Sequence, residues 1–215
     1  MTIDFAAYRI GDTSRFVTNL SDEVRGTRPG APVRGLDAIE GSDASGTVYC
    51  VVDLTGAVRQ VGITDGWWEE VGAHGVAPAV LQALQLAREK AGIAKLVLVR
   101  YGHPLPSPGP AATRAEPEPA YDDQASRVEA ARRKIDRAYA SLAESDRRLR
   151  ALNSGEGRQV VGPRGLFRVH VVGVRIVGAS VDERALRADD AGDLANDARE
   201  ALRAVRAPSA DPGER

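Results

Sequence analysis

One pattern of two strands, a glycine turn and a helix occurs twice in this chain of 215 residues. In the first half, GTVYCVVDL alternates apolar with other side chains, and AVRQVGIT follows the turn at Thr55-Gly56. Such alternation is typical of a strand with one buried face. In the second half, LFRVHVV and VRIVGASV flank Gly173 in the same way. Aligning Gly56 with Gly173 places Asp65 on Asp182 without a gap, which predicts a duplicated α+β module rather than one continuous sheet.

A proline-rich segment separates the two copies. Residues 103–120 hold six of the 12 prolines. Proline fixes φ and removes an amide donor, so this stretch cannot continue a helix or a central strand. The sequence predicts a first module over 1–102, a semi-rigid linker over 103–120, a second module over 121–207 and a disordered tail over 208–215.

Shorter signals predict the remaining elements of the first half. They predict a weak helix from Thr13 to Arg25, a strand over 33–40 and an amphipathic helix over 75–91. Pro78 is expected in the first turn of that helix, where its missing amide proton costs little. Residues 93–101 fit either an extra strand or a continuation of the helix.

The second module is predicted to begin with a long helix over 121–152, because that stretch contains neither glycine nor proline. Large apolar residues recur at every seventh position, with a second register three residues later in which Ser145 is the exception. The two registers are Val128, Ile135, Leu142 and Leu149, and Ala131, Ala138 and Leu152. This heptad pattern predicts docking against another helix or a sheet, and its alanines favour a short packed coiled coil over a long free-standing one. A final amphipathic helix is expected from Ala188 to Ala207.

The two repeated runs are similar to a known family. The run GTVYCVVDLTGAVRQVGITDGWW with VAPAVLQALQLAREKA, and GLFRVHVVGVRIVGASVDERAL with LANDAREALRAV, resemble actinobacterial members of the YbaB/EbfC family. The resemblance implies small modules, each a three-stranded antiparallel sheet flanked by helices, which are usually dimeric, nucleoid-associated and DNA-binding. Related modules serve as accessory proteins of type VII secretion.

This chain departs from the family pattern in its two copies, its shortened first helix and its proline linker. We expect the two copies to pair within one chain as a pseudo-dimer, with a homodimer as the other possibility. This pairing would be contradicted if the isolated half 121–215 were a stable monomer that does not bind 1–102.

Signals for catalysis and for cofactors are weak. His74, His103 and His170 lie far apart without ligand spacing, and His170 alternates with valines in a strand. Cys50 belongs to an apolar strand and is expected to be a buried, inert thiol. GEGRQVVG does not match G-x-G-x-x-G and follows a helix. We therefore expect no enzyme, no cofactor and no metal.

The start of the chain and its apolar runs bear on localisation. The N-terminus lacks a basic start and an apolar h-region, and no apolar run approaches the ~20 residues of a membrane span. The expectation is a cytoplasmic, nucleoid protein without membrane contact.

Arginines of the second half are the candidate nucleic-acid contacts. Because 29 basic residues face 30 acidic ones, any attraction to DNA needs a local patch. The candidates are Arg132, Arg133, Lys134, Arg137, Arg147, Arg148, Arg158, Arg164 and Arg168. Arginine matches phosphate oxygens without reading bases, so weak, salt-sensitive binding is expected. Asp136, Glu144 and Asp146 are interleaved, and a salt-bridged, solvated helix face is the alternative.

Two adjacent tryptophans are the candidate protein contact. Trp67 and Trp68 could anchor a protein partner, since tryptophan is enriched at interface hot spots. The alternative is that they cap the core where the last strand of the first module meets its helix. Asp65 and Asp182 are expected to close strand ends or cap turns.

Overall fold

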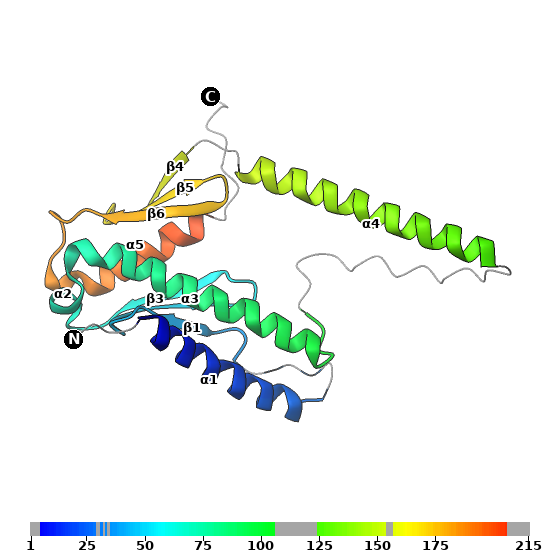
Figure 1. Ribbon diagram of the computed structural model, residues 1–215. Coiled ribbons are helices and arrows are strands. Elements are labelled where there is room, and N and C mark those ends of the chain that lie inside the picture. Colours follow the sequence, from blue (N-terminus) through cyan, green and yellow to red (C-terminus); the bar gives the residue numbers. More distant parts are fainter. Residues whose placement is uncertain are drawn as a thin grey trace. The chain divides into compact units, whose positions relative to one another are not determined.

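The computed structural model describes residues 5–28, 31, 33, 35–105, 124–153 and 157–205 of the chain. The fold is α+β, with two separate three-stranded antiparallel sheets packed against helices (Figure 1). Both sheets belong to one compact unit, and the long helix α4 (Gln124–Asn153) belongs to a second unit. The predicted fold class, with its two small sheets and one long charged helix, is confirmed.

The first sheet consists of β1 (Ile39–Ser42), β2 (Val48–Val52) and β3 (Val58–Ile63), in that order. The alternation in β2 is confirmed, because Val48, Cys50 and Val52 are buried under α3 (Gly72–Arg100). The predicted strand over 33–40 is wrong for most of its length. Residues 35–37 form a turn with Gly35 at φ +76°, so pairing with β2 starts only at Ile39.

The second sheet consists of β4 (Gly157–Val161), β5 (Phe167–Val172) and β6 (Arg175–Val181). Its predicted hairpin is confirmed, since Val172 pairs with Arg175 across a two-residue loop. Gly173 opens that loop at φ +61°, as a type II′ turn requires. Strand β4 is the third strand that the family resemblance implies for this module, but no residue pattern predicted its position.

Two helices of the first module are longer than the sequence predicts, whereas α5 begins at Ala191 and not at the expected Ala188. Helix α1 spans Phe5–Gly26, and α3 continues to Arg100, because its buried stripe extends to Ala91, Ala94 and Leu98. Pro78 lies in the second turn of α3 rather than the first. A short helix α2 (Trp67–Glu70) precedes α3, and a 3₁₀ turn (Ala188–Asp190) precedes α5 (Ala191–Ala204).

Helices α3 and α5 of the compact unit each pack on both sheets. Helix α3 packs on β1 and β2 of its own sheet and on β6 of the other, while α5 packs on β4, β5 and β3. Arg203 of α5 donates hydrogen bonds to the carbonyls of Val58 and Arg59 at 3.1 and 2.9 Å. The third strand of each sheet is therefore covered by the helix of the other module.

A buried carboxylate closes the first turn of each sheet. Between β1 and β2, Asp43 accepts hydrogen bonds from the amides of Ser45 at 3.0 Å and Val48 at 2.9 Å. Gly46 lies in this turn at φ +76°. The Asp43 side chain is 4% exposed, so these bonds satisfy a carboxylate that water barely reaches.

In the second sheet the corresponding carboxylate comes from a distant helix. The amides of Arg164 and Phe167 donate to Asp197 of α5 at 2.6 and 2.8 Å. Gly162 occupies the turn position that Asp43 has in the first sheet, and both donate their amide to the strand across the turn. A Cβ atom at Gly162 would overlap the Asp197 carboxylate. One turn thus carries its own aspartate, and the other leaves that space for an aspartate of α5.

Candidate nucleic-acid interface

Four of the predicted cations form a run on α4 near its middle. Arg132, Arg133, Lys134 and Arg137 are all exposed. The helix extends without interruption here because the segment lacks glycine and proline. Spacings of one, three and four residues spread these side chains around more than one side of the helix.

The three arginines of this run are not engaged in ion pairs with described residues. Among the described residues, these arginines make one hydrogen bond, in which Arg137 Nε donates to the carbonyl of Arg133 at 3.3 Å on the same helix. Glu129 and Asp136 are exposed and lie three or four residues from these arginines, so the basic face includes carboxylates. The guanidinium groups nevertheless retain unused donors that a phosphate could accept.

Further along α4 the charges pair with each other. Arg147 lies 3.4 Å from Glu144, and Arg150 lies 3.4 Å from Asp146. Pairs at such exposed positions contribute little to stability. The side chain of Arg148 lies outside the described part of the chain. This end of the helix has the salt-bridged, solvated face that was the alternative expectation.

The remaining predicted cations belong to the compact unit, and each has a partner there. Arg158 donates to the carbonyl of Val205 at 3.1 Å, and Arg164 forms an ion pair with Asp193. Arg168 lies 3.8 Å from Asp182. These contacts link the three arginines to turns and a helix of their own module, so part of their donor capacity is already used within the fold.

The two tryptophans have different environments. Trp67 is 1% exposed, and its Nε1 donates to the carbonyl of Ala188 at 3.1 Å. Trp68 is 36% exposed and packs edge-on against Trp67, with ring centroids 5.2 Å apart. Trp67 therefore caps the core between the modules, and only Trp68 presents surface to a partner.

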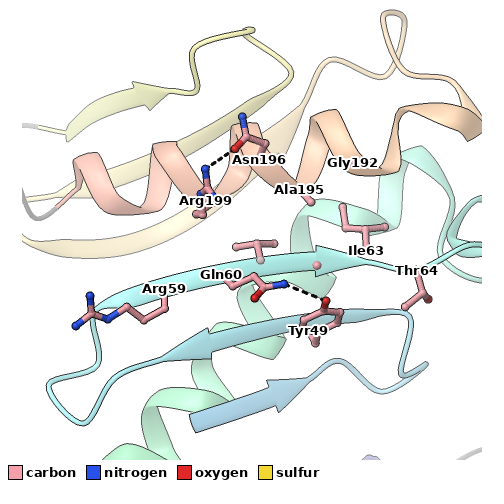
Figure 2. Close-up of a pocket in the computed structure, with 11 residues that line it drawn as sticks. Tyr49, Arg59, Gln60, Ile63, Thr64, Gly192, Ala195, Asn196 and Arg199 are labelled. Carbon is pink, nitrogen blue, oxygen red and sulfur yellow. Dashed lines mark hydrogen bonds between the residues drawn. The ribbon is translucent and has the colours of Figure 1, made fainter. Parts of the chain in front are cut away.

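A groove that sequence reasoning missed lies between β3 and α5. Its volume is about 390 Å³ (Figure 2). The floor is the outer face of the first sheet, where Gln60 Nε2 donates to the hydroxyl of Tyr49 at 3.3 Å. Gly62 makes room for the Tyr49 ring, which a Cβ atom there would overlap. Asn196 and Arg199 of α5 form the wall, and Arg199 donates to Asn196 Oδ1 at 2.5 Å.

The described lining of this groove provides hydrogen-bonding groups, namely hydroxyl, amide and guanidinium groups. Arg59 at its edge is held by Asp53 at 2.9 Å. Because β3 and α5 are far apart in sequence, no local pattern could have shown that they share a groove.

Two ionisable groups of the first sheet have shifted pKa values. Burial raises the pKa of the Cys50 thiol to about 12, so the thiol stays protonated and unreactive near neutral pH. Burial alone would raise the pKa of Asp53. Hydrogen bonds from the Thr55 hydroxyl and from the amides of Ala57 and Thr55, together with the positive charge of Arg59, stabilise the ionised carboxylate by more than burial destabilises it. The net result is an Asp53 pKa below its ordinary value.

The histidines are placed as isolated groups. His170 Nε2 lies 3.1 Å from Ser180 Oγ on the outer face of the second sheet, which fits the expected structural role. His74 is exposed, and His103 is buried after the end of α3. Among the described residues, no three His, Cys, Asp or Glu side chains gather as metal ligands would. None of the described helices is long and apolar enough to cross a membrane.

The chain was compared with known proteins by sequence and by structure. No family model, no curated protein and no solved structure matches this chain.

Proposed function

We propose that this protein is a non-enzymatic, DNA-binding, nucleoid-associated protein that contacts the phosphate backbone with little sequence specificity. The observation that carries the proposal is the exposed run of Arg132, Arg133, Lys134 and Arg137 on α4. The resemblance of both modules to the YbaB/EbfC family supports it. On this proposal the protein works in the cytoplasm, and its two modules act as a pseudo-dimer, which the packing of α5 on β3 and of α3 on β6 supports.

The magnitude of the salt effect follows from the number of cations. Four phosphate contacts would give a slope of log K against log salt of about −3.6 on duplex DNA. Between about 50 and 200 mM salt the affinity should then fall by roughly 100-fold. A net charge of −1 offers no diffuse attraction to replace the lost contacts.

A fluorescence-anisotropy titration of duplex DNA at these two salt concentrations tests the proposal. Arg133→Glu with Arg137→Glu should abolish binding at the lower salt. The matched control is Arg175→Glu with Arg184→Glu, which changes the net charge equally at exposed positions of the second sheet and its following turn. Equal loss in both double variants, or no binding by the wild type at low salt, would contradict the proposal.

A protein-interaction function is the second candidate, and a different surface favours it. Leu96 and Val99 lie one turn apart on α3 and are 71% and 59% exposed. Exposed apolar neighbours of this kind mark protein-binding surfaces. They fit an accessory or chaperone-like module of the type that the family resemblance implies for type VII secretion. Trp68, before the other end of α3, is a separate exposed apolar side chain. If the wild type did not bind duplex DNA at low salt, the protein-interaction function would be the favoured one.

A further inference from the structure

The apolar stripe of α4 is exposed to solvent where its side chains are described. Ile135 is 54% exposed, Leu142 is 65% exposed, and Tyr139 between them is 69% exposed. These side chains belong to a helix of 30 residues, which makes up the whole described part of its unit. Large apolar side chains at regular spacing along a helix are typical of a surface that another helix covers.

The spacing of the stripe specifies the kind of partner. The large residues recur at every seventh position from Val128 to Leu149, with the small or apolar companions three residues later. A helix that packs on a sheet uses a broader face with a period of 3.6 residues. A narrow seam with a period of 3.5 supercoils with a second helix that carries the same repeat. Within this sequence, α4 itself has such a repeat, so a second copy of the chain supplies a matching helix.

The sizes of the side chains favour antiparallel pairing. With the helices antiparallel and Ala138 opposite Leu142 of the second copy, Ile135 lies opposite Ser145, and Ala131 opposite Leu149. Each of these layers then combines one large and one small side chain, as close packing of helices requires. Parallel pairing would instead stack Ala138 on Ala138 and Ser145 on Ser145, and both layers would leave voids.

The flanking charges agree with this orientation. In the antiparallel pair, Arg132 lies opposite Asp146 of the second copy on one flank of the seam. On the other flank Lys134 lies opposite Arg148, and the attraction of the first pair compensates for the repulsion of the second. In a parallel pair, Arg127 lies opposite Arg132, and no pair of opposite charges compensates. Arg133 and Arg137 lie outside the seam in both cases and stay exposed.

We propose that α4 forms an antiparallel coiled coil with α4 of a second copy of this chain. The interaction surface is the heptad seam of Val128, Ala131, Ile135, Ala138, Leu142, Ser145, Leu149 and Leu152. This dimer is separate from the packing of the two sheet modules within one chain. It does not depend on DNA binding.

Sedimentation of the full chain over a range of concentrations tests the proposal. The wild type should form a concentration-dependent dimer, and Leu142→Glu should raise its dissociation constant by roughly 100-fold or more, because each dimer would bury two unpaired carboxylates. Ala140→Glu is the matched control, since Ala140 is exposed on the opposite side of the same helix. A monomer at every concentration, or a dimer that Leu142→Glu leaves unchanged, would overturn the proposal.

The orientation has its own measurement. A spin label attached through Glu129→Cys should give an axial separation of about 33 Å in the antiparallel dimer, because residue 129 lies level with residue 151 and the helix rises 1.5 Å per residue. The native Cys50 is buried and does not compete for the label. Labels lying side by side, as in a parallel pair, would refute the antiparallel arrangement.

Discussion

The aspartate that closes the second sheet's first turn offers a sharp test of the duplication. Asp197→Ala removes a fully buried carboxylate from the amides of Arg164 and Phe167. Gly162→Asp places a carboxylate where the first sheet has Asp43. Each change alone should be harmful, because the first leaves two amides without an acceptor and the second forces two carboxylates into one space. Together they should restore one carboxylate to the turn.

The magnitudes follow from the contacts. A hydrogen bond to a charged acceptor is worth about 1.5–3 kcal/mol, so Asp197→Ala should lower the free energy of unfolding by about 3 kcal/mol. Gly162→Asp alone should cost at least about 3 kcal/mol through overlap and like-charge repulsion. The double variant should lie within about 1 kcal/mol of the wild type, since changes at contacting residues are not additive.

Urea unfolding followed by circular dichroism measures these differences. With a denaturant slope of about 2 kcal/mol/M, Asp197→Ala should lower the midpoint by about 1.5 M. Asp193→Ala is the control on the same helix, because Asp193 is half exposed and its ion pair with Arg164 lies at the surface. A double variant whose loss equals the sum of the two single losses would refute the equivalence of the two turns.

Three further predictions concern the first module. Because the pKa of Cys50 is raised to about 12, its thiol should react with Ellman's reagent at pH 8 only at the rate of unfolding, and prompt reaction of the native protein would contradict its burial. Because the pKa of Asp53 is lowered in the folded state, the ionised carboxylate stabilises the folded protein above pH 3.8, and this contribution is lost as the pH falls through the folded-state pKa. Acid titrations of unfolding free energy should therefore be flatter for Asp53→Asn, and identical curves would count against the shift. Trp67→Phe should lower the free energy of unfolding by about 1–3 kcal/mol, because it removes a hydrogen bond and reduces packing in the core. Trp68→Phe should lower it by less than about 0.5 kcal/mol. Equal losses in urea unfolding would refute the conclusion that Trp67 is the core residue and Trp68 the surface residue.

Local periodicity was sufficient to predict the hairpins β2–β3 and β5–β6 and the long helix α4. Val48, Cys50 and Val52 alternate because one sheet face is buried, and this information lies within five residues of sequence. Strand β4 was not predicted because only Val160 in it is buried, so its five residues show no alternation of apolar side chains. Its pairing depends on β5 and cannot be inferred from β4 alone.

Part of the candidate nucleic-acid interface could likewise be predicted from the sequence, and part could not. The basic run at 132–137 could be recognised from sequence, and these residues are exposed on α4. That Arg164 and Arg168 have carboxylate partners could not be recognised, because Asp193 and Asp182 approach them only through the tertiary fold. Gly162 reads locally as an ordinary turn glycine, and its role as space for Asp197 appears only when α5 is in position.

The sharing of helices between the sheets also constrains how the two copies can evolve. Strand β3 has its edge carbonyls bound by Arg203, and Trp67 is bonded to a carbonyl that precedes α5. A substitution in either copy at these places alters the fit of the other. The two modules therefore depend on each other in a way that independent domains do not, and compensating substitutions should be sought across the linker rather than within one module.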